Sequence, residues 1–141
     1  MIVVDTGPLV AAAVADDAEN YRCTEFFTSV HLARQQIYVP GTVLAEAGYL
    51  IESKVSPEAE AGFLDGLATN DDVEIVETTK DDLARMAELV RQYADLPLGT
   101  TDASVIAIAE QLDITEIATL DRRHFSVVRP RHSNVLTLLP D

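Results

Sequence analysis

The chain has 141 residues, of which 48% are hydrophobic, so it can bury a core and is neither disordered nor of low complexity. Its 24 Asp and Glu residues outnumber its 10 Lys and Arg residues, and the formal net charge of −14 excludes binding of nucleic acid by a generally basic surface. Cys23 is the only cysteine, which excludes an intrachain disulfide and a thiolate zinc site. The first residues lack the pattern of a signal peptide and no apolar stretch is long enough for a membrane span, so we expect a cytoplasmic protein without membrane contact.

In the first half of the chain, short apolar strands alternate with helices. In chain order we expect a strand over 2–4, helices over 9–15 and 18–35, a strand over 37–39 and a helix over 42–53. The strand over 2–4 is continuously apolar, which is typical of a strand buried on both faces of a parallel sheet. The helix over 42–53 carries its apolar residues at helical spacing, so one of its faces is expected to pack on the core.

Residues that cap helices mark the second half of the chain. In chain order we expect a helix opened by Ser56 and Pro57, a strand over 73–76, a helix capped by Thr79, a helix over 102–112 capped by Thr100 or Thr101, and strands over 117–120 and 135–138. The helix over 102–112 is apolar nearly all round, which predicts a central position in the fold.

Strands that alternate with helices along a whole chain are typical of a layered α/β fold. We therefore predict a three-layer α/β/α structure with a central parallel sheet of four or five short strands. No linker or change of composition divides the sequence, so we expect a single domain over residues 1–141.

Four carboxylates stand at positions where an ordinary surface acid is not expected. Asp5 ends the first strand and Asp121 follows the apolar run of the fourth, and the carboxyl ends of parallel strands form the ligand crevice of open α/β sheets. Glu46 and Asp102 share the apolar faces of their helices, where a lone ionised carboxylate is costly to bury. If all four meet in one pocket, a divalent cation would cancel their repulsion, and a set of oxygen ligands favours Mg²⁺ or Mn²⁺ over zinc.

Each acid taken alone also has an ordinary role open to it. Asp102 is placed to interact with the dipole of its helix, and Asp5 to cap the turn that follows it. Asp121 is placed to pair with Arg122 or Arg123 on the surface. Glu46 is the hardest to explain in this way, because the rest of its helix face is apolar.

Four segments resemble, in order and spacing, the four acidic motifs of the PIN domain family. They are Val3-Val4-Asp5-Thr6, Val39-Pro40 with Leu44-Ala45-Glu46, residues 98–103, and Thr119-Leu120-Asp121-Arg122-Arg123-His124-Phe125. Each motif alone is unspecific, but together they span nearly the whole chain, and the resemblance is closest to the VapC-type toxins of toxin–antitoxin operons.

The resemblance implies an endoribonuclease that hydrolyses RNA phosphodiester bonds with Mg²⁺ or Mn²⁺. It makes Asp5 and Asp102 the leading metal ligands and lets Glu46 and Asp121 complete the acidic site. Thr6 and Thr119 match supporting hydroxyl positions beside the first and last acids, to orient a carboxylate or a water molecule.

The resemblance also implies partners. These are an RNA substrate, a cognate antitoxin whose basic side chain enters the acidic pocket, and a second copy of the chain in a homodimer. The apolar helices over 21–33 and 43–51 offer surface for such contacts, although the role that we favour for both is to cover the sheet. Some family members carry a further acid where this chain has His124, and the number of metal ions, one or two, stays open.

Four arginines are concentrated near the C-terminus, namely Arg122, Arg123, Arg129 and Arg131. They are placed either to hold RNA phosphate beside the acidic pocket or to pair with the acidic body of the protein. For the three histidines, His31, His124 and His132, we predict no catalytic role.

Other readings of the same residues are weaker. Asp5-Thr6-Gly7 also matches the active-site triplet of aspartic proteases, but these are all-β proteins. A haloacid-dehalogenase phosphatase requires an aspartate at the position of Gly7, and a receiver domain requires a lysine late in the chain. Two alternatives remain: a metal-free ribonuclease that uses His124 and His132, and a degenerate PIN domain that binds RNA or protein without catalysis. The second is disfavoured because none of the four acids is lost.

Overall fold

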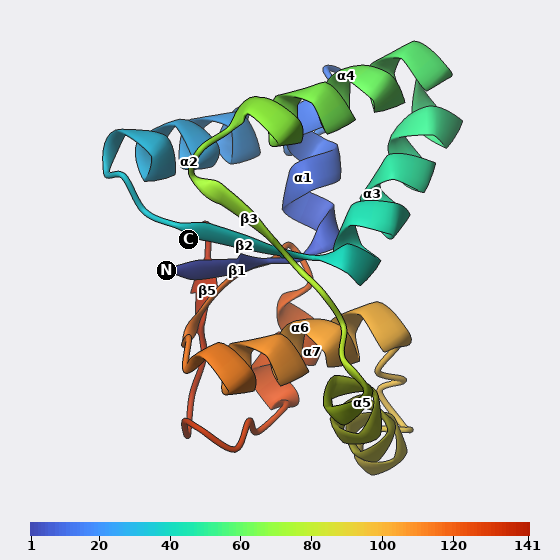
Figure 1. The fold of residues 1–141 in the computed structure, drawn as a ribbon, viewed down its shortest axis with the longest axis vertical. Coiled ribbons are helices and arrows are strands. Elements are labelled where there is room, and N and C mark those ends of the chain that lie inside the picture. The colour runs from blue at the N-terminus through green and yellow to red at the C-terminus, as the bar shows by residue number, and fades with distance from the viewer.

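Five parallel strands form one sheet in the order β3-β2-β1-β4-β5, and the computed structural model describes all 141 residues (Figure 1). In chain order the elements are β1 (Ile2–Val4), α1 (Thr6–Ala13), α2 (Asn20–Leu32), β2 (Ile37–Pro40), α3 (Gly41–Lys54), α4 (Pro57–Thr69), β3 (Val73–Val76), α5 (Lys80–Gln92), α6 (Thr100–Leu112), β4 (Glu116–Ala118), α7 (Arg122–Val127) and β5 (Thr137–Leu139). The predicted α/β fold with a central parallel sheet is confirmed.

The helices form a layer on each side of the sheet. Figure 1 shows α1 to α4 on one side and α5 to α7 on the other. Helix α6 lies against β1 and β2, and every residue from Ala103 to Ala109 is buried, as its all-round apolar sequence predicts. The strands β1, β2 and β4 supply the centre of the core with β-branched side chains that are buried on both faces of the sheet. No helix is long and apolar enough to cross a membrane.

The order of the strands creates a switch point at the middle of the sheet. From β1 the chain builds outward through β2 and β3, and it then returns to the other side of β1 to add β4 and β5. Ligands of open α/β sheets bind outside the carboxyl ends of the two strands where this reversal occurs. Here those strands are β1 and β4, which lead into Asp5 and Asp121.

Two helix starts confirm their predicted caps. The Ser56 hydroxyl accepts a hydrogen bond from the backbone N–H of Ala59, with Pro57 at the first helical position of α4. Thr79 and Asp82 form a reciprocal capping box at the start of α5, with distances of 3.1 Å and 2.9 Å. These local signals set the helix ends wherever a side chain does the capping.

Other predicted boundaries are wrong by several residues. Helix α1 begins at Thr6 rather than at Leu9, since Pro8 lies within the first turn, where its missing N–H breaks no helical hydrogen bond. Helix α2 ends at Leu32 rather than at Gln35, because Arg34 adopts a left-handed φ of 53°.

The remaining differences lie in the last third of the chain. Helix α6 is preceded by Gly99, and neither Thr100 nor Thr101 caps it, because both residues are already inside the helix. Strand β4 ends two residues earlier than expected, and β5 occupies 137–139 instead of 135–138. The short helix α7 was not predicted at all; it begins where the Asp121 carboxylate accepts a hydrogen bond from the backbone N–H of His124, at 3.2 Å.

Candidate active site

All four singled-out carboxylates line one cavity of about 740 Å³ at the switch point of the sheet. Asp5 follows β1 and precedes α1, while Asp121 precedes α7. Glu46 projects from α3, and Asp102 lies in the first turn of α6. Four separate elements therefore bring acids from both ends of the sequence to the same place.

A close approach between chain segments brings the first and last of these acids together. A Cβ atom added to Gly7, in the first turn of α1, would lie 3.3 Å from the Cβ of Leu120. That contact is tighter than side chains normally tolerate, so the absence of a side chain at Gly7 lets α1 start directly against the segment that carries Asp121. The backbone N–H of Asp5 also donates to the carbonyl of Ala118 over 2.8 Å, which fixes Asp5 to the end of β4.

Two threonines hold two of the acids. The hydroxyl of Thr119 donates to Oδ2 of Asp5 at 2.8 Å and accepts from the backbone N–H of Asp121 at 3.0 Å. The hydroxyl of Thr6 donates to Oε2 of Glu46 at 3.1 Å. Each hydroxyl thus orients a carboxylate, although Thr6 serves Glu46 on another helix and not its neighbour Asp5.

The site raises the pKa of two carboxyl groups. Asp5 is only 6% exposed, and burial raises its pKa to about 6, opposed by hydrogen bonds from the Thr6 backbone and the Thr119 side chain. The negative charges of Asp102 and Glu46 raise it further. Burial also raises the pKa of Asp102, against the lowering effect of a hydrogen bond from His124. Burial is therefore the main cause of both shifts, and the neighbouring carboxylates add to it.

His124 contacts two acids of the site without lining the cavity itself, although no role was predicted for it. Its Nδ1 is 2.8 Å from Oδ2 of Asp102 and 3.0 Å from Oδ2 of Asp121, and its side chain is 12% exposed. One ligand atom from each of these three residues lies within 4.8 Å of the other two, a spacing that suits a metal ion. The signal in the sequence is the spacing of Asp121 and His124, which places both at the start of one short helix.

The other two histidines lie elsewhere. His31 pairs with Asp72 at the protein surface, at 2.6 Å, and Nε2 of His132 contacts the carbonyl of Ile114, also at 2.6 Å. Neither lines the cavity, so a pair of catalytic histidines at 124 and 132 has no geometric support.

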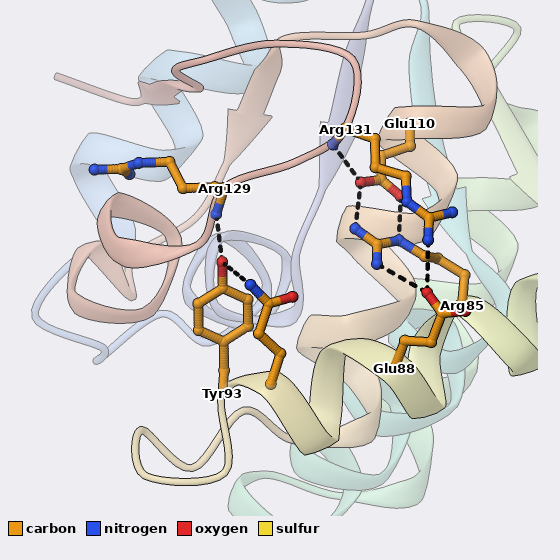
Figure 2. Close-up of polar contacts among 7 residues, drawn as sticks. Arg85, Glu88, Tyr93, Glu110, Arg129 and Arg131 are labelled. Atoms are coloured by element: carbon orange, nitrogen blue, oxygen red, sulfur yellow. Dashed lines mark hydrogen bonds and ion pairs between the residues drawn. The ribbon is translucent and has the colours of Figure 1, made fainter.

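None of the four C-terminal arginines lines the cavity. Arg122 donates to the carbonyls of Leu138 and Pro140, and Arg129 donates to nearby backbone carbonyls. Arg131 pairs with Glu88 at 2.7 Å, in a network that also includes Arg85 and Glu110 (Figure 2). Only Arg123 is next to the site, with Nη2 3.4 Å from Nε2 of His124. Most of this basic cluster therefore pairs with the protein's own body.

Asp17 and Lys54 line the cavity as well, and neither was singled out from the sequence. Asp17 lies between α1 and α2, where acids are common in turns, so nothing distinguishes it beforehand. Lys54 follows Glu46 by eight residues on α3, a spacing that returns to the same helix face and could have been noticed.

Comparisons with known proteins show the family to which this fold belongs. A family model described as PIN domain matches residues 2–129. The curated protein Ribonuclease VapC26 of Mycobacterium tuberculosis is 30% identical over 139 residues, which cover 99% of this chain and 100% of that protein.

Solved structures with less than 25% identity show the same fold. The crystal structure of VapC20 of Mycobacterium tuberculosis, described as a sarcin-ricin loop cleaving toxin, has a TM-score of 0.79 at 18% identity, covering 86% of this chain and 91% of that one. VapBC2 of Rickettsia felis, bound to a DNA fragment from its promoter, has a TM-score of 0.67 at 20% identity, covering 99% and 98%. With a family match over most of its length and a relative that matches it from end to end, this chain belongs to the PIN domain family.

Proposed function

We propose that this protein is a metal-dependent endoribonuclease that acts as the toxin of a toxin–antitoxin pair. One observation carries the proposal: four carboxylates from four separate elements line a single cavity in a chain of the PIN domain family. The name of the full-length relative, Ribonuclease VapC26, supports RNA as the substrate. The retention of all four acids argues against a PIN domain that only binds.

The donor set of the cavity fits a hard divalent cation such as Mg²⁺ or Mn²⁺. Asp5 and Asp102 would hold the ion, and burial raises the pKa of both, so a bound cation would stabilise their ionised forms. Carboxylate oxygens are the ligands that these two ions prefer. When bound, such an ion supplies a Lewis acid for the phosphate and lowers the pKa of a bound water molecule.

The chain's own residues prepare the site for that chemistry. Thr119 fixes the Asp5 carboxylate and Thr6 fixes that of Glu46, so both acids keep one orientation before substrate arrives. His124 contacts Asp102 and Asp121 together, which reduces the repulsion between these two carboxylates. Glu46 and Asp121 complete the acidic wall of the cavity, and either carboxylate would serve to accept a proton from the attacking water molecule.

An antitoxin is the proposed protein partner. One of the similar structures, VapBC2 of Rickettsia felis, is a complex bound to promoter DNA. The cavity of this chain carries five carboxylates, so a basic side chain of an antitoxin would find a complementary site there and block it. The homodimer inferred from the resemblance stays a prediction.

The first experiment compares cleavage of total cellular RNA with Mn²⁺, with Mg²⁺ and with EDTA. Asp5→Asn is purified in parallel, and Asp71→Asn, an exposed aspartate outside the cavity, serves as its matched control. We expect metal-dependent cuts at discrete sites from the wild type and from Asp71→Asn, but none from Asp5→Asn. Cleavage that persists in EDTA and in Asp5→Asn would contradict the proposal, and RNA binding without any cleavage would favour the degenerate module instead.

A further inference from the structure

Only one basic side chain lines the acidic cavity. Its charged lining residues are five carboxylates and one lysine, namely Asp5, Asp17, Glu46, Asp102, Asp121 and Lys54. Lys54 is exposed, and none of the protein's ion pairs includes it. A lysine beside several acids that pairs with none of them keeps its ammonium group available for a ligand.

The position of Lys54 follows from the geometry of α3. Glu46, Leu50 and Lys54 are spaced by four residues and all three line the cavity, so they form one stripe along the helix. Eight residues at the helical rise separate the backbone positions of Glu46 and Lys54 by about 12 Å. Glu46 and Lys54 therefore leave α3 at separate points along the cavity, with the apolar side chain of Leu50 between them.

A positive charge in the cavity would reduce the repulsion between this acidic protein and the phosphates of an RNA substrate. An RNA strand brings negative phosphates to a chain of net charge −14, and an ion that Asp5 and Asp102 would hold supplies positive charge at one end of the cavity only. A flexible lysine stem with a compact charge can contact a phosphate oxygen without reading the base attached to it.

We propose that Lys54 binds a backbone phosphate of the RNA other than the scissile one and so positions the strand along the cavity. This inference rests on the proposed function, because it assumes that RNA is the substrate. Lys54 also lies in the last turn of α3, where a cation interacts favourably with the helix dipole, and the experiment must separate that structural role from RNA binding.

Lys80 provides a matched control, since Lys54 and Lys80 are the only lysines in the chain. Lys80 is exposed at the first position of α5, takes part in no ion pair and does not line the cavity. Replacement of either lysine by alanine changes the net charge equally. A difference between the two variants therefore reports where the charge is lost and not how much.

The primary test measures binding of a fluorescein-labelled, random-sequence RNA of about 12 nucleotides, within the range of single-strand site sizes. All proteins carry Asp5→Asn to prevent cleavage and are compared in Mg²⁺ at several salt concentrations. We expect Lys54→Ala to weaken binding roughly 3- to 10-fold and to reduce the salt slope by about 0.7, as the loss of one phosphate contact predicts. Lys80→Ala should bind like its parent, and Lys54→Arg should restore most of the affinity.

A second readout uses the wild-type background and separates this inference from the proposed function. In cleavage of total RNA, Lys54→Ala should raise the half-saturating RNA concentration and leave the maximal rate nearly unchanged. Equal binding by the Lys54→Ala and Lys80→Ala proteins would overturn the role of Lys54, even if the wild type cleaves RNA. Absence of metal-dependent cleavage by the wild type would overturn the proposed function, while the binding comparison would still decide the role of Lys54.

Discussion

The Thr119 hydroxyl donates to the Asp5 carboxylate over 2.8 Å, although the two residues lie 114 positions apart in the sequence. Both are buried, with exposed fractions of 1% and 6%. The same hydroxyl accepts a hydrogen bond from the backbone N–H of Asp121. One side chain therefore fixes the position of Asp5, which follows β1, relative to Asp121, which follows β4. Parallel pairing of β1 with β4 makes this contact possible.

Replacement of Thr119 by valine should disable the site while keeping the shape of its side chain. The Asp5 carboxylate would lose a donor and the N–H of Asp121 an acceptor, which we expect to destabilise the fold by about 1–3 kcal/mol. Because the hydroxyl also orients Asp5, cleavage should fall roughly 10–100-fold. Thermal unfolding and initial cleavage rates measure the two effects.

Thr119→Ser is the control for this change, since serine keeps the hydroxyl and removes only a methyl group. It should retain most of the cleavage rate. If Thr119→Val instead cleaves RNA as fast as the wild type, the hydrogen bond to Asp5 does not matter, and a loss of activity in Thr119→Ser alone would show that the packing of the methyl group does.

The raised pKa of Asp5 predicts an unusual pH dependence for the metal-free protein. The folded state holds the Asp5 proton up to about pH 6, whereas an unfolded carboxyl group releases it near its ordinary value of 3.8. The folded state therefore binds more protons between these values, and the contribution of Asp5 to stability falls as the pH rises through them. A shift of about two units corresponds to a loss of roughly 3 kcal/mol by neutral pH.

Asp5→Asn isolates this contribution, because asparagine imitates the protonated side chain. In EDTA, the variant and the wild type should be about equally stable near pH 4, and the variant should be more stable by up to roughly 3 kcal/mol at pH 7. Urea unfolding across this range measures the difference. Added Mn²⁺ should stabilise the wild type and not the variant. A variant that is less stable than the wild type at every pH would contradict the view that burial disfavours the ionised Asp5 carboxylate.

His124→Ala should raise the pKa of Asp102 further. Burial already raises this pKa, and the hydrogen bond from His124 is the main effect that opposes the rise. Carbon-13 NMR of the aspartate carboxyl groups would follow the titration, and RNA cleavage should fall roughly 10–100-fold because Asp102 and Asp121 lose a shared partner. His124→Asn, which keeps an N–H donor, should show a smaller rise. An unchanged Asp102 titration in His124→Ala would show that the imidazole does not stabilise that carboxylate.

The four acids could be found from the sequence because their unusual positions are local features. Asp5 and Asp121 follow apolar strands, and Glu46 and Asp102 lie on apolar helix faces. A few neighbouring residues are therefore enough to show that each acid stands in an apolar surrounding. Their convergence then follows from the rule for the carboxyl ends of parallel strands. The helix caps at Ser56 and Thr79 were predictable for the same reason, since the capping contacts span only three residues.

The residues that were missed depend on contacts between distant parts of the chain. His124 enters the site only because the unpredicted helix α7 turns it toward Asp102, which lies 22 residues earlier. The placement of Arg122 likewise depends on a hydrogen bond to the carbonyl of Pro140, and the sequence around Arg122 does not predict this contact. Lys54 resembles any lysine at the end of a helix until the cavity around it is known.

An ion network near the C-terminal end of α6, at the opposite end of the helix from Asp102, should affect stability without affecting cleavage (Figure 2). Glu110 is 10% exposed; it accepts from Nε and Nη2 of Arg85 at 2.8 Å and 2.9 Å and from the backbone N–H of Arg131 at 2.6 Å. Burial alone would raise its pKa, but these hydrogen bonds lower it. Glu88 is 52% exposed and accepts from both arginines at the rim of the network.

Because of this difference in burial, Glu110→Gln should destabilise the fold by roughly 2–3 kcal/mol, as expected for the loss of charge-assisted hydrogen bonds. Glu88→Gln should cost less than about 1 kcal/mol, since exposed ion pairs contribute little. Urea unfolding gives both values, and RNA cleavage by each folded variant should match the wild type because neither residue lines the cavity. Equal losses of stability would mean that burial does not distinguish the two glutamates, and a loss of cleavage in folded Glu110→Gln would mean that the network helps to position α6 and therefore Asp102.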